Sequence, residues 1–429
     1  MEFSVQSRTQ RLLLLVAACI VSAAIALQAL QFWLAGRSIE SGRLDLMQRG
    51  AQLVPGNGES WDRVGRYWQL DFTNPDSKTA VQYYLKAVHV DPNSSFYWMD
   101  LASAYEDTGD IARARSAFDQ AEAVYPISAL VAWNYGNFLV RVGDYDGGYR
   151  KVQKAVHTDP KLLPLAISRT WRATTSVSDL LDKALPPDRE AYLQALNFFT
   201  SIHLHDAALL AWRKLIALRQ PVTIAETLAF QDSLIAADAA ADERTVWRQS
   251  LAAAGIAEQD APALIRNGDF AHDFINGGLG WRWAAPPGVS ASFDSPGPSR
   301  QGRSIRLDFT GGANVSLDQP AQFVTVEPGR AYRFHAWLRT DQITTESGVQ
   351  FSVADPNHNG DVNLLTDNLT GSHNWTSVEA NVAAGPKTHF LLVRLLRPPS
   401  RLFDNKISGT VWVSDVSLVP ADAGARRSP

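Results

Sequence analysis

The sequence predicts a multidomain protein in which an apolar N-terminal helix precedes an all-α array of helical hairpins and an all-β sandwich. Three observations carry this prediction. No charged residue lies between Arg11 and Arg37, and helix-forming residues give way near Pro262 to Gly, Pro, Asn, Ser and Thr around short β-branched runs. Between these regions three prolines stand 34 residues apart (126 − 92 and 160 − 126), at Pro92, Pro126 and Pro160. With 429 residues, 45% of them apolar, the chain is too long for a single core.

The first apolar run, residues 12–34, is uncharged and long enough to cross the roughly 30 Å hydrocarbon layer as a helix. We therefore predict a transmembrane signal anchor, with Trp33 at the membrane interface. Two alternatives stay open, a cleaved secretory signal ending near Ala24 and Ala26, and a lipoprotein signal at Cys19. The short basic tail before the run favours a periplasmic or extracytoplasmic location for the bulk of the chain.

The middle copy of the 34-residue period shows its pattern most clearly. A fixed period of this length indicates stacked helical hairpins. Large and small residues spaced three, four and seven apart share one face of a first helix, a glycine permits positive φ in the turn, and alanines let a second helix approach closely. The residues given these structural roles are Trp98, Leu101, Ala102, Tyr105, Gly109, Ala114, Phe118, Ala121 and Pro126.

This block resembles the tetratricopeptide repeat (TPR) family. The resemblance implies a helical solenoid whose concave groove binds a protein partner. We expect TPR repeats over residues 40–160, with about three extra residues in the Asp71–Ser77 turn of the first copy. Trp133 of the third copy lies one place from the family position. Apolar patterning predicts degenerate helical hairpins over residues 161–258.

The region 264–420 contains short strand-like runs separated by turn residues, which predicts an all-β sandwich. The expected strands are Ser304–Phe309, Phe323–Val326, Ala331–Leu338, Val349–Val353, Thr376–Val382, His389–Leu396 and Val411–Val419. The region also resembles the jelly-roll carbohydrate-binding modules, in the motifs Asn267-Gly268-Asp269-Phe270, Gly280-Trp281 and Asp415-Val416-Ser417-Leu418. The resemblance implies a jelly roll that binds glycan, and residues 421–429 are expected to form a disordered tail.

Alternation along Ala331–Arg339 places an indole among polar side chains on one side of a strand. Sugars are commonly held by stacking on aromatic rings while polar side chains bind their hydroxyls. The candidate carbohydrate-binding residues are Trp283, His335, Trp337, Arg339, Gln350 and Arg394. The alternative, in which Trp337 packs under a loop and the arginines are solvated, stays open. Trp412, which follows Val411 and precedes Val413, is predicted to be a core residue.

The segment Asp355–Asp361 matches the first half of a calcium-binding loop, because oxygen side chains alternate and Gly360 falls at the sixth position. An ordinary Asn/Gly hairpin is the favoured alternative, since the second half of the loop pattern is missing. The resemblance to the jelly-roll carbohydrate-binding modules also implies a structural calcium ion near the two ends of the domain. The candidate ligands are Asp269, Asp355, Asn357, Asn359, Asp361 and Asp415, and no other cofactor is expected.

The net charge of −4 gives no indication of a basic surface that would bind nucleic acid. The chain has a single cysteine, which excludes a disulfide framework and a cysteine metal site within one chain. The sequence contains no nucleophile elbow, phosphate loop or zinc-protease motif, so we predict that it is not an enzyme. The expected function is a membrane-anchored scaffold with a protein partner in its groove and a polysaccharide on its sandwich, in envelope or exopolysaccharide assembly or export. The alternatives are a purely structural adaptor and an unrecognised glycoside hydrolase with two catalytic carboxylates.

Overall fold

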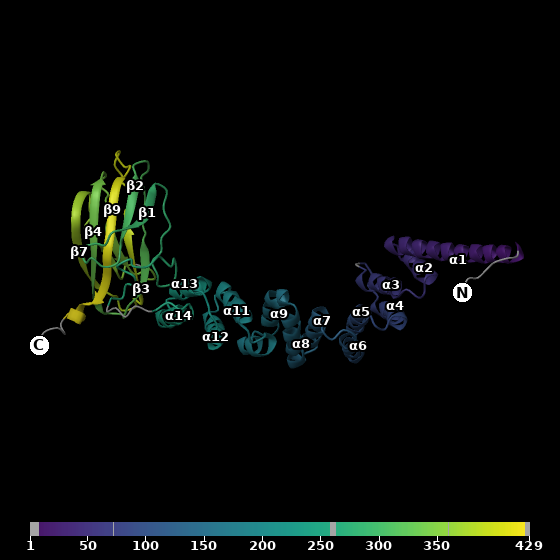
Figure 1. Ribbon diagram of the computed structural model, residues 1–429. Helices are drawn as coiled ribbons and strands as arrows, with labels where there is room; N and C mark the ends of the chain where they lie inside the picture. Colours follow the sequence, from purple (N-terminus) through teal and green to yellow (C-terminus); the bar gives the residue numbers. More distant parts are fainter. Residues whose placement is uncertain (1–7, 72, 258–262, 359, 425–429) are drawn as a thin grey trace, which may run out of the picture. The chain divides into compact units, whose positions relative to one another are not determined.

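The computed structural model describes residues 8–71, 73–257, 263–358 and 360–424. It divides into two compact units, residues 1–187 and 188–429. The predicted fold class is confirmed, because an apolar helix and helical hairpins are followed by an antiparallel β-sandwich (Figure 1). The end of the predicted disordered tail, residues 425–429, lies outside the described residues.

Helix α1 (Arg8–Glu40) is long and apolar enough to span a membrane, and none of its most apolar window is buried. Its length and composition suit a membrane anchor or a signal sequence. The last turns differ from the rest, since Ala35 and Ile39 are buried where α1 packs on α2 (Leu44–Leu53). A Cβ at Gly50 would lie 2.9 Å from the carbonyl oxygen of Ala35, so the glycine permits this close contact. The end of α1 therefore belongs to the first folded unit.

Three helical hairpins follow, with bounds that reproduce the repeat. They are α3 (Gly58–Leu70) with α4 (Ser77–Val90), α5 (Ser95–Asp107) with α6 (Ile111–Val124), and α7 (Ala129–Arg141) with α8 (Tyr145–Thr158). In both of the first two hairpins a tryptophan Nε1 donates to a proline carbonyl six residues earlier, Trp61 to Pro55 at 2.9 Å and Trp98 to Pro92 at 2.8 Å. These tryptophans are 37 positions apart (98 − 61), so the three extra residues lie between α3 and α4, as the sequence predicts.

The middle hairpins share one apolar layer around Phe118, whose side chain is buried. Its ring stacks on Tyr135 with 5.1 Å between centroids, and Trp98 and Tyr105 pack against the same cluster. The turn residue Gly109 has a φ of 80°, a conformation that costs a residue without Cβ little. Seven of the nine residues to which the sequence assigned structural roles therefore pack in one cluster, and Gly109 and Pro126 lie outside it.

The first unit ends with η1 (Pro160–Leu162), α9 (Leu163–Thr174), α10 (Val177–Asp179) and the π-helical turn η2 (Leu180–Ala184). The second unit begins with α11 (Arg189–Ser201) and α12 (His205–Ala217), followed by η3 (Ile224–Thr227), α13 (Leu228–Ala236) and α14 (Ala240–Ala253). Within residues 161–258, α11 with α12 and α13 with α14 form two helical hairpins.

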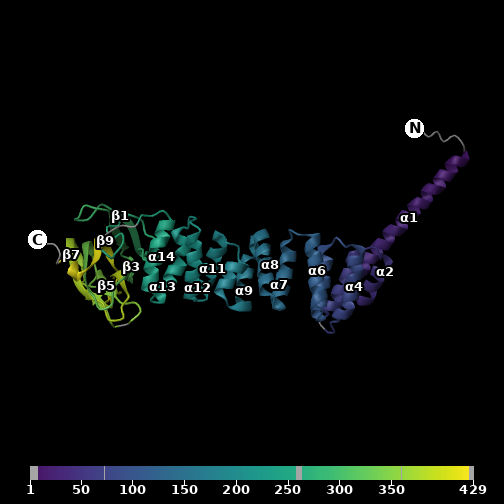
Figure 2. The same ribbon diagram turned by 90° about the horizontal axis from the view of Figure 1, so that it is seen from below.

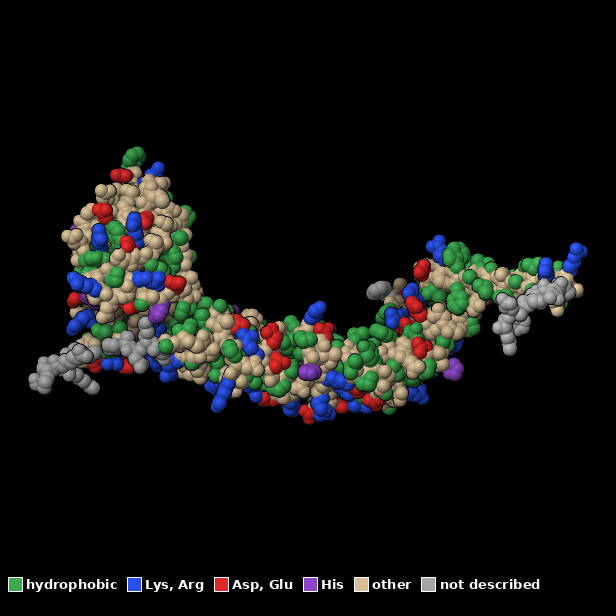
Figure 3. Space-filling view, in the orientation of Figure 1, with side chains coloured by type: hydrophobic (Ala, Val, Ile, Leu, Met, Phe, Trp, Pro, Cys, Tyr) green, Lys and Arg blue, Asp and Glu red, His purple; other side chains and the backbone are tan. Residues whose placement is uncertain are grey.

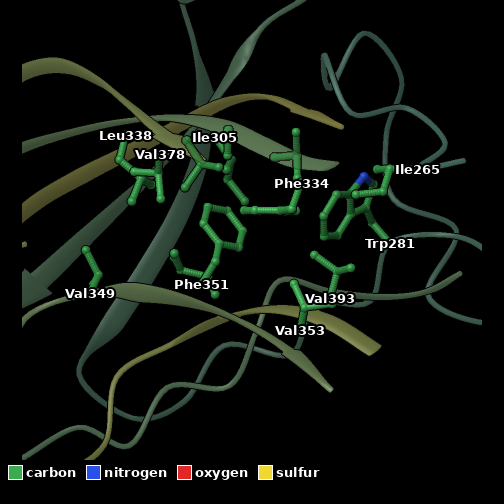
Figure 4. Close-up of a cluster of buried hydrophobic side chains, with 14 of the residues drawn as sticks. Ile265, Trp281, Ile305, Phe334, Leu338, Val349, Phe351, Val353, Val378 and Val393 are labelled. Atoms are coloured by element: carbon green, nitrogen blue, oxygen red, sulfur yellow. The ribbon is translucent and has the colours of Figure 1, made fainter. Parts of the chain in front are cut away.

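The sandwich consists of two antiparallel sheets. Its strands are β1 (Val289–Asp294), β2 (Ser304–Thr310), β3 (Ala321–Thr325), β4 (Ala331–Ile343), β5 (Gln350–Ala354), β6 (Asn363–Leu365), β7 (Gly371–Ala383), β8 (Phe390–Leu396) and β9 (Ser408–Pro420). One sheet has the order β1-β2-β9-β4-β7 and the other β3-β8-β5-β6. Their facing side chains form one core, in which Phe334 of β4 meets Phe351 of β5 with 5.0 Å between ring centroids (Figure 4). The short helix η4 (Ala421–Gly424) follows β9.

Helices α13 and α14 pack beside the four-stranded sheet, near β3 (Figure 2). Trp247 and Leu251 of α14 join Phe390 of β8 in a small apolar cluster. Asp232 of α13 pairs with Arg282 in the segment that precedes β1. This helical hairpin and the sandwich therefore form one compact unit. The change of composition near Pro262 gave no indication of this packing.

Candidate functional site

In the first unit, helices α3, α5 and α7 lie in a row, because α3 contacts α5 and α5 contacts α7. Hydrogen bonds link them between residues about one repeat apart. Arg66 donates to Asp100 at 2.8 Å, Gln69 to Ser103 at 3.1 Å, and Arg141 to Glu106 at 2.6 Å. We call the surface formed by Arg66, Leu70, Phe96, Asp100, Leu130 and Arg141 the first-helix face. These bonds hold neighbouring hairpins in fixed register along it.

Large apolar side chains stand exposed on this face. Phe96 is 54% exposed, and Leu130, at the equivalent place 34 positions later, is 45% exposed. Leu70 near the end of α3 is 66% exposed. An apolar side chain repeated at one place in successive hairpins gives a regularly spaced contact for an extended chain. These residues were not predicted from the sequence, because the repeat pattern identifies the buried face of each helix and they lie on the exposed face. Their common repeat position was the available signal.

An open cavity of about 950 Å³ lies at the start of the first-helix face. Residues from the end of α1, from α2, from α3 and from the start of α5 line it, among them Ile39, Met47, Asp62, Tyr67, Phe96 and Tyr97. It therefore adjoins the point where the apolar helix α1 enters the folded unit.

Asp62 is the unusual group of this cavity, because its side chain is only 3% exposed. One carboxylate oxygen pairs with Arg66 at 3.0 Å, and the other, Oδ1, has no hydrogen-bond partner. Burial, with the nearby Asp100 carboxylate, raises the pKa of Asp62, and Arg66 opposes the rise. A buried carboxylate with an unsatisfied oxygen is costly to folding, so the group is a functional candidate.

In the second unit, the predicted sugar-binding residues of β4 do share one outward face. His335, Trp337 and Arg339 alternate with the buried Phe334, Ala336 and Leu338. The imidazole and the Trp337 indole meet edge to face, with 5.6 Å between ring centroids. Both rings are half-buried and Arg339 is exposed, on β4, which lies between β9 and β7 in the five-stranded sheet. Figure 3 shows basic and acidic side chains interspersed over the visible face of this sheet.

The prediction that Trp412 is a core residue is wrong. Its neighbours Val411 and Val413 face the core, so its indole lies on the outer face of the five-stranded sheet. There it is buried between two guanidinium groups, Arg306 at 5.5 Å and Arg339 at 4.4 Å from the ring centroid. Its Nε1 donates to Asp294 at 2.9 Å. Arg339 is therefore held beside Trp337 by packing on a second indole.

The structure separates the other three sugar-binding candidates from this face. Gln350 and Arg394 belong to β5 and β8 of the four-stranded sheet, where they point away from the core on the opposite side of the sandwich. Trp283 packs against the edge of the core, and its backbone N–H donates to Asn276. Six residues that looked like one set thus lie in three places.

Two residues of the predicted calcium loop, Asp355 and Asn357, make hydrogen bonds within the protein. The carboxylate of Asp355 accepts the N–H groups of Asn357 and His358 and the hydroxyl of Thr388. Asn357 donates to Asp238 in the turn before α14. Asp361 is exposed, and Asn359 lies outside the described residues. The loop thus forms a hydrogen-bonded turn that contacts the helices.

The second pair of calcium candidates is similarly engaged. Asp415 accepts from Ser299 at 2.7 Å, and Asp269 accepts the backbone N–H of Ala271 at 3.3 Å. Over the described residues, no group of three or more His, Cys, Asp or Glu side chains could hold a metal ion. The calcium site stays a prediction of the sequence.

No family model matches the chain, and no curated protein matches it. Two crystal structures of MamA are 16% identical to it and cover 41% and 44% of this chain and 85% and 90% of their own, with TM-scores of 0.27 and 0.29. A structure described as "CBM4 structure and function" is 13% identical, covers 36% of this chain and 99% of its own, and has a TM-score of 0.27.

Proposed function

We propose that this chain is a non-catalytic, membrane-anchored scaffold whose first-helix face binds an extended segment of a protein partner. The observation that carries the proposal is the pair Phe96 and Leu130, exposed at equivalent places on helices that inter-repeat hydrogen bonds hold in register. These two apolar side chains are exposed to solvent one repeat apart. A partner segment that spans two hairpins would contact both of them.

The packing of α1 supports the anchoring part of the proposal. The helix continues without a break from its apolar stretch to Glu40, and its last turns pack on α2. Retaining α1 keeps the first-helix face close to the bilayer, whereas cleavage near Ala26 would release it. An extracytoplasmic setting in envelope or exopolysaccharide assembly would suit a scaffold that also carries a glycan site.

Selection from a library of displayed 12-residue peptides, on the full chain in lipid nanodiscs, tests the partner site. We expect the selected peptides to lose about tenfold or more in affinity for Phe96→Ser and for Leu130→Ser, because each change removes an apolar contact. The matched control is Leu85→Ser, which removes a 39%-exposed leucine from the second helix of its hairpin. Equal loss of affinity in all three variants, or none in any, would contradict the proposal.

A second function, glycan binding, is favoured by the face that carries His335, Trp337 and Arg339. A partly exposed indole beside polar donors on the outer face of the sheet suits stacking of a sugar ring. We propose that this face, without Gln350, Arg394 and Trp283, is the sugar platform.

Affinity electrophoresis of the full chain in gels containing xylan, β-glucan, dextran, alginate or polygalacturonate tests the platform. We expect at least one polysaccharide to retard the protein, and Trp337→Ala to abolish the retardation through loss of the stacking surface. Phe403→Ala, at a fully exposed aromatic residue of a distant loop, should leave it unchanged. If none of the five retards the wild type, the platform is not a sugar site.

A further inference from the structure

The charges around the cavity at the start of the first-helix face do not balance. Arg63 pairs with Glu59 at 2.8 Å, which accounts for one acid and one base. Arg66, however, serves two carboxylates, Asp62 at 3.0 Å and Asp100 at 2.6 Å. With both carboxylates ionised, the pair therefore carries one negative charge that no cation in the cavity matches.

One atom of the pair, Oδ1 of Asp62, is available to carry the unmatched charge. Oδ1 of Asp62 is buried without a hydrogen-bond partner, while Oδ2 is occupied by Arg66. Once Asp62 is ionised, this buried oxygen needs a donor, and a ligand that displaces the proton would supply one. An ammonium or guanidinium group would provide both the proton donor and the missing positive charge.

Rings line the same cavity and suit the rest of a basic side chain. Tyr67 of α3 and Phe96 and Tyr97 of α5 all line it. The methylene stem of a lysine or arginine packs well on such apolar surfaces while its charged head reaches a polar group. The volume of about 950 Å³ accommodates a side chain of this size together with the adjoining backbone.

We propose that this cavity binds a lysine or arginine side chain of the extended segment, with the cation between Asp62 and Asp100. The inference rests on the proposed function, because it names the chemistry of the residue that enters the start of the first-helix face. The partner segment is thus expected to place a basic residue beside the apolar ones that meet Phe96 and Leu130.

Binding of a cation here is coupled to a proton. The groups that face Asp62 are Glu59, Arg63 and Arg66 on its own helix, Tyr84 on α4, and Tyr97 and Asp100 on α5. Burial and Asp100 favour the protonated form of Asp62 in the free protein, which is why its pKa is raised. A bound cation favours the ionised form, so the proton leaves on binding and affinity rises with pH across the neutral range.

Fluorescence anisotropy with the full chain in nanodiscs and three labelled peptides tests the inference. The peptides are (Ala-Lys-Leu)4, (Ala-Gln-Leu)4 and (Ala-Glu-Leu)4, which differ only in charge. We expect the lysine peptide to bind about tenfold more tightly than the glutamine peptide, and the acidic peptide most weakly. The advantage of the lysine peptide should grow from pH 6 to pH 9.

Asp62→Asn should remove the lysine advantage and its pH dependence, while the neutral amide retains the shape of the protonated carboxyl group. Asp146→Asn is the matched control, since it removes the same charge from a 69%-exposed site on α8 and should change nothing. If all three peptides bind equally, or if Asp62→Asn keeps the lysine preference, the inference is overturned. If the three peptides bind equally and Phe96→Ser abolishes their binding, the inference is overturned but the proposed function stands. If there is no lysine preference and Phe96→Ser does not weaken binding, both are overturned.

Discussion

Replacing Arg397 with methionine should lower the free energy of unfolding of the second unit by about 3 to 5 kcal/mol. The side chain is fully buried at the end of β8, and burial lowers the pKa of its guanidinium. That guanidinium donates to five oxygen atoms in three different loops, those of Asn314, Val315, Thr345, Ser347 and Asn405. Methionine fills much of the volume but makes none of these five hydrogen bonds, and only Asn314 and Ser347 keep a second donor, from Ser400 and Thr345.

Chemical denaturation followed by circular dichroism at the β-sheet band measures this effect. Arg401→Met is the matched control, because Arg401 lies four positions later in the same connection and is exposed. Its replacement should change the free energy of unfolding by less than about 0.5 kcal/mol. Equal stability of the two variants would show that the buried guanidinium does not hold the loops together.

Glu243→Gln should stabilise the second unit at pH 8 by roughly 4 to 5 kcal/mol and leave it nearly unchanged at pH 4. Glu243 of α14 is fully buried, and neither carboxylate oxygen has a hydrogen-bond partner. Burial, with a smaller contribution from Asp232, raises its pKa to about 9, against the opposing effect of Arg282. The folded protein thus retains a proton that the unfolded chain loses above about pH 4.5.

The sign of the pH dependence follows from that difference. Because the folded pKa is the higher one, the group's contribution is fully present below about pH 4.5 and is lost as the pH rises towards 9. Glutamine does not titrate, so the stability difference between variant and wild type should grow by about 1.4 kcal/mol per pH unit between pH 5 and pH 8. Glu190→Gln, at an exposed position on α11, should show no such slope. A constant difference from pH 5 to pH 8 would contradict the assignment.

The repeats could be predicted from sequence because they depend on local spacing. The positions of Trp61 and Trp98 set the register of the first two hairpins, and each tryptophan makes the same bond to a proline carbonyl. Alternation likewise located most strands, because alternate residues face opposite sides of a sheet. Strand β1 was missed although Val289, Ala291 and Phe293 alternate with polar residues, and in the structure only Val289 of this edge strand is buried.

The grouping of the site residues could not be predicted, because it depends on which sheet each strand joins. Trp337 and Arg394 both point away from the core, but β4 and β8 lie in different sheets and thus place them on opposite outer faces. The burial of the Asp62 carboxylate could not be predicted from the sequence either. Nothing in the local sequence separates Asp62 from the exposed Asp107, although the cavity and Arg66 single it out in the structure.

The central claim is that the first-helix face holds a polypeptide. It is tested most directly by photo-crosslinking a selected 12-residue peptide to full-length protein that carries benzoylphenylalanine at position 96, 130 or 85. Crosslinks from positions 96 and 130 to different ends of the peptide, with none from position 85, are the predicted result, because an extended peptide would span two adjacent hairpins. Crosslinks from position 85 alone would place the peptide on the second helices and contradict the claim.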